Sequence, residues 1–90
     1  MLFAVICDDA PDKAHLREEG RPAHRAYLVE SGVVQQAGPF LNADGAMCGS
    51  LILIDVDDQA AAEAWAANDP YAKAGLFTTT SVRPWNRVIG

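Results

Sequence analysis

Two residues of this chain, His24 and Asp69, have side chains suited to moving a proton. Helical spacing over residues 21–28 puts His24 on the same face as Leu28, which we expect to point toward a sheet. His24 then falls at the edge of a buried face. Partial burial favours the neutral ring, the form that acts as a base. The alternative is a structural histidine that donates to a backbone carbonyl.

Asp69 directly follows an alanine-rich helical segment and precedes Pro70. A carboxylate is unfavourable at the C-terminal end of a helix, so another role must explain it. Asp followed by Pro is typical of an N-cap and first position of a new turn, here residues 70–74. Asp69 could equally orient His24 in an acid–base pair. The two roles are compatible because one carboxylate has two oxygens.

Further residues are candidates for holding a small-molecule ligand. Ser50 and Tyr71 can supply hydrogen bonds, and Arg21 lies one helical turn before His24. Residues 40–47 contain Asn, Asp and Gly and are predicted to form a mobile loop, with Phe40 as an apolar wall over the pocket. These four residues are predicted to bind substrate.

Several kinds of site are not indicated. The sequence has no Walker motif and no G-x-G-x-x-G stretch. Cys7 and Cys48 lack the paired spacing of a zinc site, and His24 with Asp69 offers no obvious third metal ligand. We therefore expect neither a metal nor a cofactor.

Length and charge narrow the function further. Ninety residues are one domain, 1–90, and the net charge of −5 argues against binding to nucleic acid or an anionic membrane. Two cysteines in apolar runs are typical of free thiols in a reducing compartment. The start of the chain lacks the features of a signal peptide. A cytoplasmic location is the expectation.

The elements that must position these residues follow from hydrophobic patterning. Strands are predicted over 2–7, 33–37, 48–56 and 76–85. Residues 11–31 are predicted to be helical in two pieces, separated at Gly20 and Pro22. An alanine-rich helix is predicted over 59–68, with Ala61, Ala64, Trp65 and Asn68 on one stripe. The order βαββαβ indicates a ferredoxin-like α+β fold, an antiparallel sheet with two helices on one face.

The strand predicted at 48–56 is largely apolar on both faces. Two helices can cover only one face of such a sheet. The other would remain exposed in a monomer, so we expect a homodimer that pairs through the sheet face.

An ordered set of residues resembles the YciI-like, or YCII-related, family. The set includes Arg21-x-x-His24-x-x-Tyr27-Leu28, Gly38-Pro39, Gly49-Ser50, Asp69-Pro70-Tyr71 and Pro84-Trp85. The resemblance implies a ferredoxin-like domain that pairs as a dimeric α+β barrel. It also implies an active site on a histidine and an aspartate, matching His24 and Asp69. One branch of the family is linked to dehydrochlorination of chlorinated hydroxyquinols, and other members occur in transcription contexts.

Two classes of function are consistent with these observations. The first is a cofactor-independent enzyme in which His24, oriented by Asp69, acts as acid or base on a small cyclic or carbonyl-bearing molecule. The second is a non-catalytic dimeric module that binds a small ligand in a regulatory role. A purely structural dimer is a third.

Overall fold

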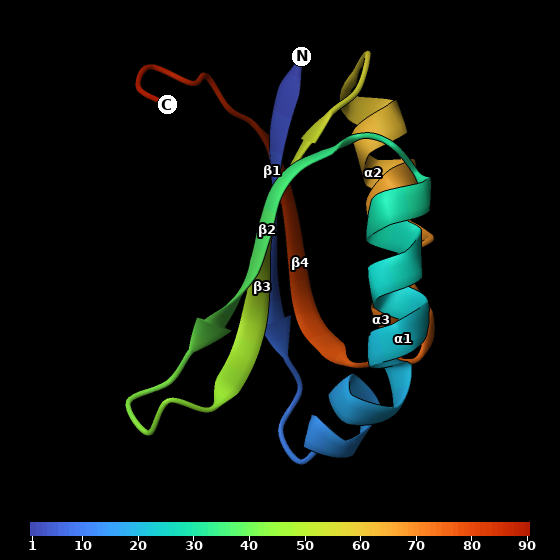
Figure 1. Cartoon of the computed structure of the whole chain (residues 1–90), viewed down its shortest axis with the longest axis vertical. Helices are drawn as coiled ribbons and strands as arrows, with labels where there is room; N and C mark the ends of the chain where they lie inside the picture. The colour runs from blue at the N-terminus through green and yellow to red at the C-terminus, as the bar shows by residue number, and fades with distance from the viewer.

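The computed structural model describes all residues 1–90 as one sheet with a single layer of helices (Figure 1). The sheet has four antiparallel strands in the order β2-β3-β1-β4. The strands are β1 Leu2–Asp9, β2 Val34–Leu41, β3 Met47–Asp55 and β4 Phe77–Pro84. The helices are α1 Ala14–Glu30, α2 Gln59–Ala67 and the short α3 Pro70–Lys73. The predicted ferredoxin-like α+β fold is therefore confirmed.

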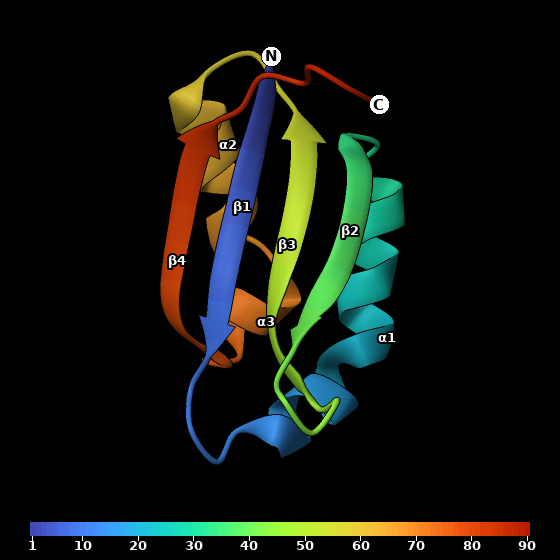
Figure 2. The same ribbon diagram turned by 90° about the vertical axis from the view of Figure 1, so that its left-hand side faces the viewer.

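The helices cover one face of the sheet and leave the other open (Figure 2). On β3, Ser50, Ile52 and Ile54 point toward the helices and are buried, as the alternating pattern predicts. Leu51 belongs to the open face and is 37% exposed. None of the helices combines the length and the apolar character that crossing a bilayer requires.

The hydrophobic core lies between α2 and the two central strands. Phe3 and Val5 of β1 and Ile54 of β3 are almost fully buried against Ala62 and Trp65 of α2. The predicted stripe on α2 is wrong in part, because Ala62 and Ala66 face the sheet whereas Ala64 and Asn68 are exposed. An alanine-rich helix is apolar all round, so its sequence does not decide which side packs.

The prediction of a helix in two pieces is wrong, since α1 runs unbroken through Gly20 and Pro22. Pro22 lacks the N–H that would bond the Glu18 carbonyl, but both residues are exposed, so water can satisfy that carbonyl. Gly20 serves another purpose. A Cβ there would come within 3.2 Å of the Tyr71 ring. The glycine therefore lets Tyr71 lie against α1 rather than ending the helix.

The predicted mobile loop at 40–47 is also wrong at both ends. β2 continues to Leu41 and β3 begins at Met47. Pro39 is tolerated because β2 is an edge strand, where a missing N–H costs little. The remaining turn is held by Asn42, whose side chain accepts from the backbone N–H groups of Asp44 and Ala46. This part of the chain is a hydrogen-bonded hairpin.

Candidate active site

His24 and Asp69 meet across the fold. Nδ1 of His24 lies 2.8 Å from Oδ1 of Asp69, and both residues are buried, 8% and 2% exposed. A carboxylate accepts hydrogen bonds, so Nδ1 carries the proton of this contact. The neutral ring then keeps its lone pair on Nε2. The arrangement fixes the tautomer and orientation of His24, as a general base or acid requires.

Asp69 also caps the short helix α3. The same Oδ1 accepts from the backbone N–H of Tyr71 at 3.0 Å, and Pro70 occupies the first turn. The capping role and the contact with His24 thus occur together on one oxygen. The cap of α2, by contrast, is purely structural, with Asp58 accepting from the N–H of Ala61.

Tyr71 forms the floor beneath His24. The two rings stack with centroids 3.9 Å apart and planes 12° from parallel. The Tyr71 hydroxyl donates to the carbonyl of Arg17 at 3.0 Å. The proton of this hydroxyl is therefore already donated within the protein, so the hydroxyl has only its lone pairs left to offer a ligand. The predicted hydrogen bond from Tyr71 to a substrate stays a prediction.

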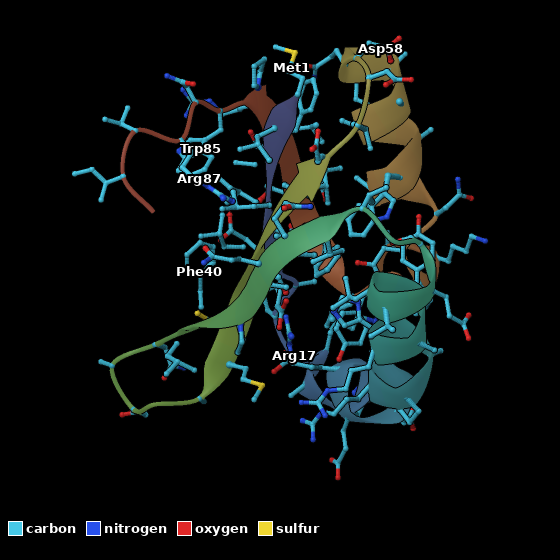
Figure 3. All side chains as sticks on the ribbon, turned by 45° about the horizontal axis from the view of Figure 1, so that its top comes forward. Met1, Arg17, Phe40, Asp58, Trp85 and Arg87 are labelled. Atoms are coloured by element: carbon cyan, nitrogen blue, oxygen red, sulfur yellow. The ribbon has the colours of Figure 1, made fainter.

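Arg17 also belongs to this region of the structure, although it was not among the predicted site residues. It is buried, 7% exposed, on the helix side of the sheet (Figure 3). Its Nε and Nη2 donate to the two carboxylate oxygens of Asp9 at 2.9 and 2.7 Å. Nη2 also reaches the Gly49 carbonyl and the Ser50 hydroxyl. Burial lowers the pKa of Arg17, but the hydrogen bonds and charge of Asp9 outweigh it, so the pKa is raised above its ordinary value.

A signal for Arg17 exists in the sequence. Arg17, Arg21 and His24 are spaced i, i+4 and i+7, which places them on one face of a continuous helix. The break predicted at Gly20 and Pro22 obscured that spacing.

These side chains surround a hollow between α1 and the strands β2 and β3. Its volume is about 140 Å³, close to that of a cavity that holds one benzene ring. His24, Arg21 and Ser50 line it together with Tyr71. Leu28, Pro39 and Ile52 supply apolar walls, with further contributions from Arg17, Arg25, Ala37, Gly38 and Met47.

Phe40 is not brought to this hollow. It pairs with Gly49 across β2 and β3 and lies on the open face of the sheet, 38% exposed (Figure 3). The alternation of the strand explains this: Ala37 and Pro39 face α1, so Phe40 points the other way. The predicted role of Phe40 as an apolar wall of the pocket does not agree with this geometry.

Two other titratable residues, Tyr27 and His15, lie outside the His24–Asp69 pair. The Tyr27 hydroxyl donates to the carbonyl of Trp65 at 2.7 Å, and burial raises the pKa of Tyr27. His15 is exposed. No three His, Cys, Asp or Glu side chains gather in an arrangement that would hold a metal ion.

The fold and the hollow define a class: a single ferredoxin-like α+β domain with a buried His–Asp pair under its first helix. Comparison with known proteins makes this specific. Residues 1–86 match the YCII-related domain. The chain therefore belongs to the YCII-related family.

Relatives with sequence or structural similarity agree. Protein YciI of Escherichia coli is 33% identical over 99% of this chain and 100% of its own length. An uncharacterised protein of Haemophilus influenzae is 28% identical over the same shares. A 5-chloro-2-hydroxyhydroquinone dehydrochlorinase of Burkholderia phenoliruptrix, solved in complex with 2,5-dihydroxybenzoquinone, superimposes with a TM-score of 0.88 at 34% identity, covering 96% of this chain and 94% of that one.

Proposed function

We propose that this protein is a small enzyme that transfers a proton to or from a small organic substrate without a cofactor. The observation that carries the proposal is the 2.8 Å contact between His24 and Asp69 at the wall of a hollow large enough for one ring. A histidine whose tautomer is fixed by a buried carboxylate is suited to general acid–base catalysis.

The chemistry would run through Nε2 of His24. In the neutral ring this nitrogen accepts a proton from a C–H or O–H group of the substrate, and the bonding electron pair moves into the substrate. An elimination follows if a leaving group departs with its own electron pair; a tautomerisation follows if the proton returns at another atom. Asp69 stabilises the imidazolium while it exists. The proton on Nε2 then passes to the product or to water.

Ser50 is placed to help. Its hydroxyl oxygen accepts from Nη2 of Arg17 at 3.2 Å, so its own proton remains available for donation into the hollow. Arg17 would then be a positioning residue, because it holds Ser50 and the carbonyl of Gly49 in place. A substrate oxygen bearing developing negative charge is the natural acceptor for that hydroxyl.

The dehydrochlorinase of Burkholderia phenoliruptrix supports the reaction class. By its name it removes hydrogen and chlorine from a chlorinated hydroxyhydroquinone, and its chain superimposes on nearly all of this one. Loss of HCl is an elimination that needs a base and a leaving group. The His24–Asp69 pair would supply the base, and elimination of a leaving group from an activated ring is the first reaction to test.

The test is chloride release from 5-chloro-2-hydroxyhydroquinone, measured for the native protein and for His24→Asn. General acid–base catalysis contributes ~10²–10⁴-fold, so we expect His24→Asn to lose about that factor in kcat. His15→Asn is the matched control, because His15 lies exposed on the same helix. Equal turnover in native protein and His24→Asn would refute the proposed base. Ligand binding without turnover would favour the binding module.

We further propose that the open face of the sheet pairs with a second copy. Leu51, Phe40 and Trp85 are 37%, 38% and 40% exposed there, and the figure shows Phe40 and Trp85 on the side away from α1 (Figure 3). Apolar side chains clustered on one sheet face are typical of an interface.

Leu51→Lys should convert a dimer to a monomer in light scattering at micromolar concentration. Val29→Lys, at an exposed apolar position on α1, should leave the dimer intact.

A further inference from the structure

Positive charge is concentrated around the hollow. Three of the seven Lys and Arg residues of the chain, Arg17, Arg21 and Arg25, line it, whereas none of the twelve Asp and Glu residues does. The chain as a whole carries a net charge of −5. The lining of the hollow therefore has the opposite sign to the rest of the protein. Such a local field raises the concentration of anions at the site.

Arg17 and His24 already have carboxylate partners. Arg17 forms a two-pronged ion pair with Asp9, and His24 contacts Asp69. Arg21 and Arg25 form no ion pair in the structure. They lie four residues apart on α1, so their side chains extend over the same face of the helix. Two guanidinium groups without a counter-charge thus border one side of the hollow.

The rest of the lining limits what an anion there can be. The volume of about 140 Å³ leaves room for one ring. Leu28, Pro39 and Ile52 give that ring apolar walls. A simple hydrated ion such as phosphate would gain nothing from these walls, whereas a ring bearing an ionised oxygen would use both parts of the lining. Guanidinium groups bind planar carboxylates through paired hydrogen bonds.

We propose that the hollow selects small single-ring organic anions, with the ionised oxygens on Arg21 and Arg25 and the ring between α1 and strands β2 and β3. Arg21 and Arg25 are then the residues that determine specificity for charge. The proposal rests on the proposed function only in placing the reacting atom of the ring near Nε2 of His24; binding of the anion does not require turnover.

The test compares two probes of equal shape, benzoate and the neutral benzamide, titrated into the full-length protein and followed by amide chemical shifts in NMR. Charge-assisted hydrogen bonds predict that benzoate binds about 10–100-fold more tightly than benzamide, with benzoate saturating at millimolar concentrations. Shifts should map to α1, β2 and β3. The Arg21→Gln/Arg25→Gln variant should bind benzoate no better than benzamide.

Arg87→Gln is the matched control, because Arg87 lies on the tail after β4, on the open side of the sheet (Figure 3). It should bind benzoate as the native protein does. Equal binding of the two probes, no shifts from millimolar benzoate, or an equal loss in Arg87→Gln would each overturn the proposal.

The same titration separates this proposal from the proposed function. His24→Asn should retain the preference for benzoate while losing chloride release. Selective benzoate binding without any turnover would keep the anion site and refute the enzyme. Turnover that depends on His24, with equal binding of benzoate and benzamide, would support the enzyme and refute the anion site.

Discussion

The two halves of the helical layer treat the same sheet differently. Over β4 and β1, α2 presents Ala62 and Ala66 (Figure 2), whose small side chains let the helix backbone approach closely and close the core. Next to β2, α1 presents Arg17 and His24, and a hollow of about 140 Å³ remains. One half of the layer is packed and apolar, whereas the other is open and holds buried charge.

The packed half of the layer contributes mainly to stability, whereas the open half holds the residues of the proposed site. The packed half buries Phe3, Ile54 and Trp65 and provides apolar burial that favours folding. The open half contains buried polar groups that are stable only because each has a partner. Substitutions in the two halves should therefore lower the free energy of unfolding for different physical reasons, and denaturation experiments can measure the difference.

The largest effect is expected from Asp9→Ala in the open half. The substitution leaves the buried guanidinium of Arg17 without its carboxylate partner. Removing one member of a buried ion pair costs about 3–5 kcal/mol in the free energy of unfolding. Urea denaturation followed by circular dichroism measures it. The Arg17→Met/Asp9→Leu variant should recover most of the loss, and equal losses in the single and double variants would contradict the argument.

The next largest effect is expected from alanine substitutions at two isoleucines of β3. Ile54 lies in the closed core under α2, whereas Ile52 is equally buried but also borders the hollow. Ile54→Ala should cost about 2–5 kcal/mol, because the new cavity is sealed. Ile52→Ala should cost less, since it enlarges a space that water already reaches. A larger loss for Ile52→Ala in the same denaturation experiment would remove the distinction between the halves.

A smaller effect is expected from Gly49→Ala on β3. A Cβ at this position would lie 2.4 Å from the Cys7 carbonyl oxygen, so the backbone must shift. Overpacking of this kind costs about 1–3 kcal/mol. The matched control is Gly38→Ala on β2, where a Cβ meets no atom within 4 Å. Similar thermal midpoints for the two variants would show that β1 and β3 are looser than the contact implies.

The smallest effect concerns the two thiols. Burial raises the pKa of Cys7 from 9.0 to about 11, whereas Cys48 is only half-buried. Iodoacetamide at pH 8 should therefore label Cys48 and spare Cys7 in mass spectrometry. The folded state also holds the Cys7 proton more tightly than the unfolded chain does. Stability should fall as the pH rises from 9.0 through about 11. Cys7→Ala should remove the part of that fall due to this thiol and leave the part due to Tyr27, whose pKa burial raises above 10.0.

Local patterns predicted most of the elements. The apolar runs of β1 and β3 and the alanine-rich α2 were placed correctly to within a residue or two, because short-range signals decide them. Local patterns placed His24 on a helix face and Asp69 at an Asp-Pro cap, but their meeting was only one alternative for Asp69 and was otherwise implied by the family resemblance. Their contact is present in the structure, and its catalytic role stays a proposal.

The errors arose where long-range contacts override local signals. Gly20 and Pro22 usually interrupt a helix, but here the ring of Tyr71 from α3 packs against Gly20 and α1 continues. The spacing of Arg17 with Arg21 and His24 indicates a shared helix face, but its ion pair with Asp9 on β1 is a long-range contact that the helix sequence does not show. Phe40 was assigned to a loop, but pairing with β3 makes it part of a strand and turns it to the open face.

Asp69 joins two tasks on a single oxygen, since Oδ1 serves both His24 and the first turn of α3. Replacing Asp69 would therefore remove both contacts at once. A substitution of Asp69 that leaves His24 without its partner also loosens α3, the short helix that carries Tyr71, whose ring stacks against His24. Divergence toward a new reaction in this scaffold would proceed more easily by changing the residues around the rim than by replacing this aspartate.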